Sequence, residues 1–550
     1  MKTEEERLTN FSCNDRADQL WDVAVIGTGM GGATVGYELA KAGHRVIFLE
    51  KGQSEFSDAD DTMQLGNEDP SARLKSGSWP TKIKYTIGGR ESKTFPPLGC
   101  GAGGTTLLYA AALERFDPVD FTPSADSDHT KLGWPITFEQ FQPYYEYAEA
   151  LFKVRGTWDP LRPTGNSHLL EPPSLTASDE HFLDTFIGSG LHPYRLHVAC
   201  AYEPGCNGCG GYICIRKCKG DAKTICLEPA LATGNAHMID RCEVEHLEAD
   251  ASKVREIHCR RDGKIFVIRA RIIVLAAGAY FSPVILLKSK NKYWPRGLAN
   301  NSDMVGRNLM FHASDHIAVW PRGKFSMKGP LKTLAFRDFY THQGIKLGSV
   351  QSTGLTVGYG NIVYFLKTTF DQSRWSWLKP VRPLLRIPAY IASIIFGRAT
   401  IFATILEDKP YPDNRIIVDP EEPSGMRFNY EVHAELRERI SLLRNLVNKA
   451  LSRHRLMIVT PDINLNLGHP SGTCRFGNDP SSSVLDVNNK AHDLENLYVV
   501  DASFMPTSGG ANPSLTIAAN ALRVGAHISD LLRYDENSVQ DKPVINLART

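Results

Sequence analysis

The sequence lacks the charge imbalance and the long apolar runs that mark nucleic-acid-binding and membrane-spanning proteins. Its 62 Lys and Arg residues are matched by 61 Asp and Glu residues, so the formal net charge is only +1. This overall balance gives no electrostatic basis for binding nucleic acid or an anionic membrane. Residues 1–19 are polar and acidic and contain no apolar core, so we expect no signal peptide and a cytoplasmic location.

The longest apolar segment is too short and too interrupted to cross a bilayer. It covers residues 375–396, Pro388 interrupts it, and Arg398 follows it. We therefore predict no transmembrane span and interpret the segment as a core helix. The alternative is a hydrophobic lid or a patch that rests on a membrane, which would give peripheral membrane contact.

Cysteine is concentrated in one part of the chain. Six of the 11 cysteines fall within residues 200–226, and four of them form the pattern Cys206-x-x-Cys209-x-x-x-x-Cys214-x-x-x-Cys218. Three or four converging thiolates can hold an iron–sulfur cluster or zinc. The alternative is a set of disulfides or idle thiols.

The most informative motif lies near the start of the chain. Residues 23–26 are apolar and predict a buried parallel strand, which leads into a helix through the turn Gly27-x-Gly29-x-x-Gly32. The first glycine permits a tight turn, the second lets a pyrophosphate approach the backbone, and the third lets the helix pack closely. The next predicted strand, residues 45–49, leads into Glu50, whose carboxylate can accept the hydroxyls of an adenosine ribose. Together these features predict a dinucleotide site.

Later stretches extend this pattern. Residues 271–279 and 497–501 are apolar and predict further buried strands, and residues 99–106 are rich in glycine, which lets the backbone lie flat against a planar ligand. For residues 99–106, a flexible loop is the alternative. Asn512 and Pro513 predict a helix start, with Asn512 as the N-cap. Residues 305–460 alternate polar and apolar side chains, which is typical of antiparallel strands in a second, substrate-facing domain.

These motifs resemble, in order and over nearly the whole chain, those of the glucose–methanol–choline (GMC) flavoprotein oxidoreductases. Besides the first glycine motif with Glu50, the resemblance rests on Gly103-Gly104-Thr105-Thr106, Leu275-Ala276-Ala277-Gly278-Ala279 with Ser282-Pro283, Leu406-Glu407-Asp408-Lys409-Pro410 with Asn414-Arg415, His469-Pro470-Ser471-Gly472-Thr473-Cys474-Arg475, Asp501-Ala502-Ser503, and Asn512-Pro513 with Thr516.

The resemblance implies an α/β fold in which a Rossmann-like FAD-binding domain carries an inserted antiparallel-sheet substrate domain (α+β). We expect the FAD-binding domain at residues 20–130, 221–304 and 461–535. A connecting and cysteine-rich segment is expected at 131–220, and the substrate domain at 305–460.

The resemblance also implies the site residues. A histidine matching His469 takes the proton of an alcohol hydroxyl while hydride passes to the flavin, and Asn512 matches its partner. The residues expected to bind FAD are Gly27, Gly29, Gly32, Glu50, Gly103, Gly104, Thr105, Thr106, Val244, Ala277, Gly278, Asp501, Ala502, Asn512, Pro513 and Thr516.

Two features bear on the cofactors. Members with covalent FAD carry a histidine just beyond the Gly-Gly pair, where this chain has Leu107-Leu108-Tyr109, so we expect noncovalent FAD. The spacing of Cys209, Cys214 and Cys218 resembles that of iron–sulfur-containing bacterial sugar dehydrogenases of the family, which implies these three as candidate ligands of such a cluster.

We therefore predict an FAD-dependent dehydrogenase or oxidase that acts on a CH–OH group of a sugar, polyol or larger alcohol. One alternative is an enzyme for a lipid-like or sterol alcohol, which the apolar segment 375–396 favours. A flavin-bound sensing or structural protein is the other, and it would need a degraded His469–Asn512 pair. The electron acceptor is left open between oxygen, a quinone and a cytochrome.

Overall fold

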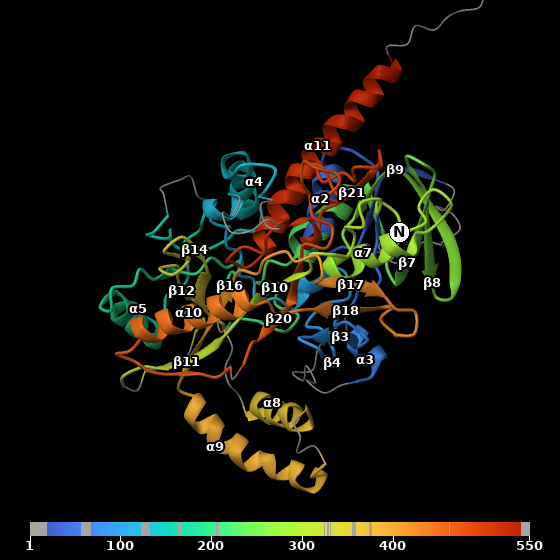
Figure 1. The fold of residues 1–550 in the computed structure, drawn as a ribbon. Helices are drawn as coiled ribbons and strands as arrows, with labels where there is room; N and C mark the ends of the chain where they lie inside the picture. The colour runs from blue at the N-terminus through green and yellow to red at the C-terminus, as the bar shows by residue number, and fades with distance from the viewer. Residues whose placement is uncertain are drawn as a thin grey trace, which may run out of the picture.

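The computed structural model describes residues 19–56, 68–122, 133–162, 168–204, 206, 208–323, 325–326, 329–330, 332–354, 359–372, 377–460 and 462–540. These residues form a body built on a seven-stranded and an eight-stranded sheet, from which a helical arm projects (Figure 1).

The seven-stranded sheet carries the predicted nucleotide motif. Its parallel strands are, in order, β6 (Ala236–Ile239), β2 (Val46–Leu49), β1 (Leu20–Ile26), β9 (Lys264–Leu275) and β21 (Leu497–Val499). Apart from Leu20 at the start of β1, the apolar residues of β1 and β2 are buried, as expected of a parallel sheet with helices on its faces. The antiparallel strands β7 (Cys242–Ala249) and β8 (Val254–Arg261) extend the sheet from β9.

Two helices from opposite ends of the chain lie together on this sheet. They are α2 (Met30–Lys41) and α11 (Ser514–Gln540). Gly36 lets α2 approach the sheet, because a Cβ atom there would lie 2.2 Å from the ring of Phe48. The other helices of the body are α3 (Pro70–Lys75), α4 (Phe138–Leu151), α5 (Ala177–Ile187), α6 (Glu228–Ala232), α7 (Gly278–Lys288) and α10 (Ala434–Ala450).

The eight-stranded sheet is antiparallel throughout. Six strands follow the order β19 (Arg455–Ile458), β11 (His316–Trp320), β16 (Thr400–Leu406), β15 (Gly348–Ser352), β12 (Leu334–Phe336) and β5 (Tyr194–Arg195), and β10 (Met310–Ala313) links β16 to β20 (Leu465–Ser471). The antiparallel sheet predicted from the alternating pattern is therefore confirmed. A smaller sheet contains β17 (Arg415–Val418), β18 (Met426–Tyr430), β3 (Ile83–Ile87) and β4 (Arg90–Thr94).

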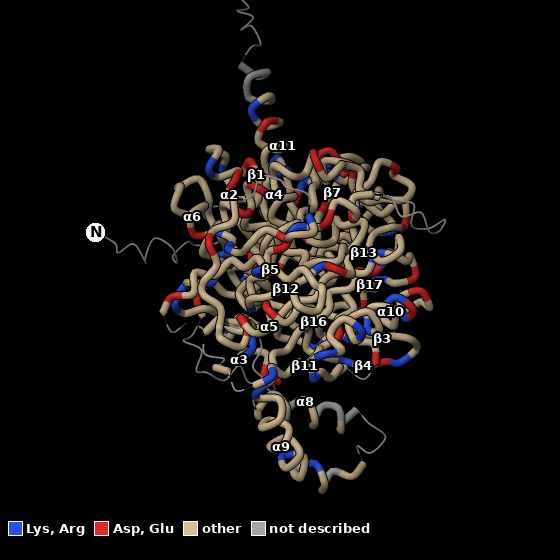
Figure 2. Tube along the Cα trace, turned by 90° about the vertical axis from the view of Figure 1, so that its left-hand side faces the viewer, with Lys and Arg blue, Asp and Glu red and all other residues tan. Residues whose placement is uncertain are grey.

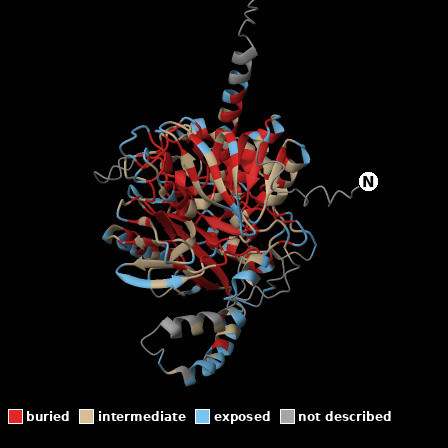
Figure 3. Cartoon of the chain, turned by 90° about the vertical axis from the view of Figure 1, so that its right-hand side faces the viewer, coloured by how far each residue is buried: buried red, intermediate tan, exposed pale blue. Residues whose placement is uncertain are grey.

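The helical arm corrects one prediction. It consists of α8 (Tyr359–Gln372), a 3-10 turn (Lys379–Leu385) and α9 (Arg386–Phe396), and Trp375 lies outside the described residues. The core helix predicted within 375–396 is wrong, because α9 buries only Ala389 and leaves most of its apolar side chains exposed (Figure 3). None of the helices in the described part of the chain has the length and apolarity needed to span a bilayer.

Candidate active site

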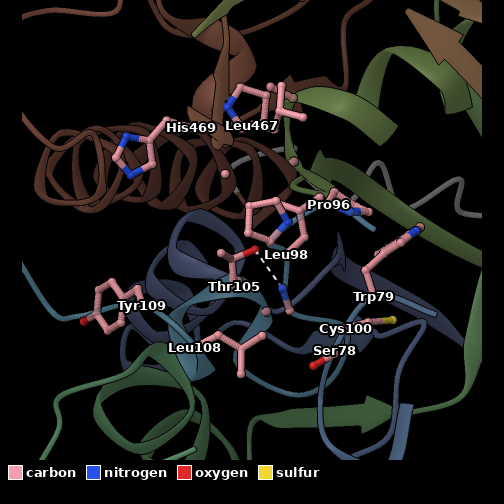
Figure 4. Close-up of a pocket in the computed structure, with 18 of the residues that line it drawn as sticks. Ser78, Trp79, Pro96, Leu98, Cys100, Thr105, Leu108, Tyr109, Leu467 and His469 are labelled. Atoms are coloured by element: carbon pink, nitrogen blue, oxygen red, sulfur yellow. Dashed lines mark hydrogen bonds between the residues drawn. The ribbon is translucent and has the colours of Figure 1, made fainter. Parts of the chain in front are cut away.

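A cavity of about 1610 Å³ lies where the parallel strands end and the antiparallel sheet begins (Figure 4). Residues just beyond the ends of β1, β2, β9 and β21 line it, which is the usual ligand position in an open parallel sheet. A pocket for one small ligand measures roughly 300–1000 Å³. The cavity therefore has room for a dinucleotide and a second molecule.

Glu50 lies at the end of β2 and is buried at the cavity wall. One carboxylate oxygen accepts hydrogen bonds from the backbone N–H (3.1 Å) and the hydroxyl (2.6 Å) of Thr28, and the other accepts from the Gly52 N–H (2.8 Å). Burial raises the pKa of Glu50, and these hydrogen bonds oppose that effect. A carboxylate offers about four lone-pair positions. Glu50 can therefore still accept a ribose hydroxyl.

The backbone turns around the cavity require glycine. Gly27 has φ +96°, and a Cβ atom there would lie 2.5 Å from the carbonyl oxygen of Ala276. Gly104 has φ +56°, and its Cβ would lie 2.7 Å from the Cα atom of Gly29. These close approaches leave bare backbone facing the cavity, as a bound pyrophosphate requires.

Most of the predicted FAD-binding residues line this cavity. Those that do are Gly27, Gly29, Glu50, Gly104, Thr105, Thr106, Val244, Ala277, Gly278, Asp501, Ala502, Asn512 and Pro513. Three others lie behind it. Gly32 packs on the Gly27 carbonyl, Gly103 donates its N–H to the Thr28 hydroxyl (3.2 Å), and the Thr516 hydroxyl bonds the Tyr145 hydroxyl (2.7 Å). Their role is to support the cavity wall.

Figure 4 shows the loop after the Gly-Gly pair, where covalent FAD would need a histidine. The Thr105 hydroxyl accepts the Gly99 N–H at 3.3 Å, and Leu108 and Tyr109 follow along the wall. The Tyr109 hydroxyl is held by the Gly220 carbonyl.

Asp501 joins two elements at the cavity. One carboxylate oxygen accepts the Gly278 N–H (3.0 Å) and the Ser282 hydroxyl, and the other accepts the N–H (2.9 Å) and hydroxyl (2.6 Å) of Ser503. The start of α7 and the turn after β21 are thereby fixed relative to each other.

His469, on β20, lines the cavity and contacts a second histidine. Its Nδ1 lies 3.0 Å from Nδ1 of His312, a buried residue of β10. His312 Nε2 lies 3.1 Å from the Ser508 carbonyl oxygen and 3.0 Å from the Gly509 carbonyl oxygen. Because carbonyls only accept hydrogen bonds, the His312 proton is on Nε2, and its Nδ1 accepts the proton of His469 Nδ1. The network thus assigns the free lone pair of His469 to Nε2.

Burial keeps both imidazoles neutral. It lowers the pKa of His312 to about 4, and it lowers the pKa of His469 well below its usual value, with the positive charge of Lys332 adding to the effect. Lys332 also lines the cavity, and burial lowers its pKa to about 8. A neutral base therefore faces the cavity beside a lysine.

Asn512 is held by a residue that the sequence did not reveal. Gln351, on β15, donates from Nε2 to the Asn512 Oδ1 at 2.8 Å, and both residues line the cavity. The N-cap prediction for Asn512 is wrong, because α11 begins at Ser514 and the Pro513 carbonyl accepts the first helical N–H, from Ile517. With its oxygen occupied, Asn512 has amide hydrogens to offer a ligand.

The cysteine loop brings five sulfur atoms together. The Sγ atoms of Cys200, Cys206 and Cys218 all lie within 4.8 Å of one another. Cys218 Sγ is 3.6 Å from that of Cys206 and 3.5 Å from that of Cys214, and Cys209 hydrogen-bonds Cys214. None of the ten described cysteines is joined in a disulfide.

Lys219 fastens this loop to the cavity wall. Its buried ammonium donates to the carbonyls of Leu107 (2.7 Å), Tyr109 (3.2 Å), Cys209 (3.1 Å) and Tyr212 (2.6 Å). The first two carbonyls belong to the loop after the Gly-Gly pair, and Tyr212 lines the cavity. The sulfur cluster therefore lies behind the part of the cavity wall that the loop after the Gly-Gly pair forms.

Sequence reasoning missed His312, Gln351, Lys332 and Lys219. Each acts through a contact with a residue far away in the chain, for example 157 positions between His312 and His469. Short-range spacing carries no signal for such contacts.

Comparison with known proteins places these features in a family. Residues 194–314 and 410–521 match the GMC oxidoreductase family in its N- and C-terminal parts, and residues 22–88 match an FAD binding domain. The chain is 28% identical over 552 residues to 6'''-hydroxyparomomycin C oxidase from Streptomyces lividus, covering 94% of this chain and 93% of that protein. It is 28% identical to 2-methyl-1,2-propanediol dehydrogenase from Mycolicibacterium austroafricanum, covering 93% of this chain and 96% of that protein.

Solved structures show the same fold. Pyridoxine 4-oxidase from Mesorbium loti superposes with a TM-score of 0.63 at 17% identity, covering 92% of this chain and 99% of that one. Formate oxidase from Aspergillus oryzae gives a TM-score of 0.64 at 14% identity, covering 94% and 99%. The chain therefore belongs to the GMC oxidoreductases and is an FAD-dependent enzyme that oxidises CH–OH groups.

Proposed function

We propose that His469 is the base that removes the hydroxyl proton of the alcohol substrate and that Asn512 holds the same oxygen. Bound FAD would supply the hydride acceptor. As hydride leaves the carbinol carbon, the hydroxyl must lose its proton, because a protonated carbonyl is high in energy. The observation that supports this role is the hydrogen bond from His469 to His312, which leaves the lone pair on His469 Nε2.

Asn512 and Lys332 would assist at the substrate oxygen. Gln351 occupies the Asn512 Oδ1, so the Asn512 amide hydrogens are available to an oxygen that gains negative charge. Lys332 lines the same cavity and places a positive charge near His469. Both groups would stabilise the negative charge on the substrate oxygen after its proton has left.

The test is anaerobic flavin reduction by an excess of alcohol. His469→Ala should slow this single step by about 10²–10⁴-fold while FAD stays bound. The matched control is His246→Ala, a histidine of β7 outside the cavity lining, which should reduce at the wild-type rate. A His469→Ala protein that keeps its FAD and is reduced as fast as the wild type would disprove the assignment.

For the substrate we propose a polar, hydroxyl-rich alcohol such as a sugar or polyol. Polar side chains around His469 support this choice, among them Lys332, Gln351, Asn464 and Asn466. The relatives named for an aminoglycoside and a diol point the same way. A lipid-like or sterol alcohol is not favoured.

We also propose that FAD is bound noncovalently. Leu108 and Tyr109 support this, because they lie on the cavity wall where a histidine would be needed for covalent attachment.

We also propose that the cysteine loop binds a metal centre. Thiolates are the donors that iron–sulfur clusters and zinc use. The three sulfurs that lie within 4.8 Å are those of Cys200, Cys206 and Cys218, whereas the spacing-based candidates were Cys209, Cys214 and Cys218. An iron–sulfur cluster here would carry electrons away from the flavin site, and zinc would stabilise the loop. The electron acceptor stays open between oxygen, a quinone and a cytochrome, and the cytoplasmic location stays a prediction.

A further inference from the structure

The apolar stripe on α9 faces outward. Five exposed residues of this helix recur at the spacing of one helix face: Ile387, Tyr390, Ile391, Ile394 and Ile395. The exposed fraction is 61% for Ile387, 53% for Ile391 and 57% for Ile394. Val381 and Leu384 continue the stripe through the preceding turn. A surface helix normally turns such a face toward the core, so this stripe is a candidate contact surface.

The same arm is strongly basic. Between Asp371 and Glu407 the sequence contains no acidic residue, and it contains Arg374, Lys379, Arg382, Arg386 and Arg398. Figure 2 shows blue positions on α9 with no red among the coloured residues of the arm. Exposed apolar residues beside basic ones are the composition of helices that lie in a membrane interface.

The arm stands apart from the body, at the mouth of the cavity. Figures 1 and 2 show α8 and α9 hanging below the sheets as a separate hairpin. Gly360, Val363 and Lys367 of α8 and Arg382 of the turn line the outer cavity. A flat surface that receives α9 would therefore lie close to the cavity entrance.

We propose that the arm, residues 359–372 and 377–398, docks the enzyme on an anionic phospholipid bilayer, with the α9 stripe inserted among the lipids and the basic side chains at the headgroups. Charge complementarity selects this occupant. Buried apolar area and attraction between Lys or Arg and anionic lipid are the two terms that hold interfacial helices, and the arm supplies both. A second copy of the chain would instead bring the basic side chains of two arms together, among them the exposed Arg386 and Arg398.

The test uses the FAD-loaded full-length protein and sedimentation with vesicles. Vesicles of phosphatidylglycerol and phosphatidylcholine in equal parts should bind the wild type, and vesicles of phosphatidylcholine alone should bind it at least about tenfold more weakly. Raised salt should weaken binding to the anionic vesicles. Two variants should each weaken it at least about tenfold: Ile387→Ser/Ile391→Ser/Ile394→Ser and Arg386→Glu/Arg398→Glu.

The matched control is Ile265→Ser, an equally exposed isoleucine at the β8–β9 hairpin, which should bind vesicles as the wild type does. Unchanged flavin absorbance and melting temperature show that each variant is folded. Failure of the wild type to bind anionic vesicles overturns the proposal. An arm variant that still binds vesicles also overturns the proposal. This holds even if that variant changes the oligomeric state seen in light scattering or the KM for a soluble alcohol.

Discussion

The imidazole of His312 accepts a hydrogen bond from the imidazole of His469, over 3.0 Å between their Nδ1 atoms. His312 can only accept there because the carbonyls of Ser508 and Gly509 take the proton of its Nε2. Two backbone carbonyls thus set the tautomer of one histidine, and that histidine sets the tautomer of the next. The proposed base is thereby oriented before substrate arrives.

His312 should consequently act as a positioning residue. We expect His312→Leu to slow anaerobic flavin reduction by roughly tenfold, since the loss of about 1.4 kcal/mol corresponds to that factor. His312→Gln keeps one donor for the carbonyls and one acceptor for His469, so it should recover most of the rate. A purely structural role would lower the melting temperature of the two variants without this difference in rate.

The pH dependence should report the neutral state of His469. A base works while it is unprotonated, and burial lowers the His469 pKa, so kcat/KM should stay level as the pH falls through 6.5 and decline only below it. The charge of Lys332 contributes to that lowering. Lys332→Met should therefore move the acid limb to higher pH, and Lys332→Arg should leave it nearly unmoved. An acid limb at the same pH in Lys332→Met would contradict this assignment.

The pH dependence of folding stability should reflect the lowered pKa of His312. The unfolded chain protonates His312 near 6.5, whereas the folded protein does so only near 4. Between these values the unfolded state binds more protons, so this contribution to stability is lost as the pH falls from 6.5 toward 4. Urea unfolding at a series of pH values should show a shallower loss in His312→Gln than in the wild type.

The sequence predicted the parts of the fold that depend on neighbouring residues. Residues 23–26 could be assigned to a strand because their apolar run is local, and Gly27 could be assigned to a turn because the glycine spacing is local. Gln351 could not be linked to Asn512, because the pairing of β15 decides that contact. The α9 prediction failed for a different reason. Periodicity reveals an apolar face, but it does not reveal whether that face meets a core or the surface.

Glu50 should be the main polar anchor of the adenosine end of FAD. Glu50→Gln replaces a charged acceptor by a neutral one of the same shape. Charged hydrogen bonds contribute roughly 1.5–3 kcal/mol, so the dissociation constant for FAD should rise by about 10- to 100-fold. The recovery of FAD fluorescence on dilution of the protein measures this dissociation constant. Glu495→Gln, an exposed carboxylate paired with Lys253, is the control and should keep the wild-type constant. Equal constants for both variants would exclude Glu50 as an anchor.

Lys219 should hold the cysteine loop in place. Lys219→Met leaves the carbonyls of Leu107, Tyr109 and Tyr212 without this donor, whereas the Cys209 carbonyl keeps the Tyr212 N–H. Each unsatisfied buried acceptor costs about 1–3 kcal/mol, so we expect a loss of roughly 3 kcal/mol or more. Because Leu107 and Tyr109 belong to the flavin wall, FAD should also be released at a lower temperature. Differential scanning fluorimetry measures both effects, because flavin emission follows the release of FAD and tryptophan emission follows unfolding. Lys217→Met, an exposed neighbour, should change neither.

The cysteine loop offers two sets of three ligands that share Cys218, and the metal content of the protein should distinguish them. Around one tetrahedral ion with bonds of about 2.3 Å, neighbouring sulfurs lie about 3.8 Å apart. The distances from Cys218 to Cys206 and Cys214, 3.6 Å and 3.5 Å, are close to that value. Thiolates that bind different irons of one cluster lie farther apart.

Anaerobically purified protein should therefore contain zinc in a ratio of about one per chain if a single ion is held, and iron with acid-labile sulfide if the loop opens around a cluster. Cys218→Ser should remove the metal in either case, and Cys259→Ser, a buried thiol of β8, should keep it. Cys200→Ser should remove it if the ligands are Cys200, Cys206 and Cys218, whose sulfurs lie within 4.8 Å of one another, and Cys209→Ser should do so if the sequence spacing identifies the ligands. Wild-type protein without metal after reconstitution with zinc, and with iron and sulfide, would reject both sets.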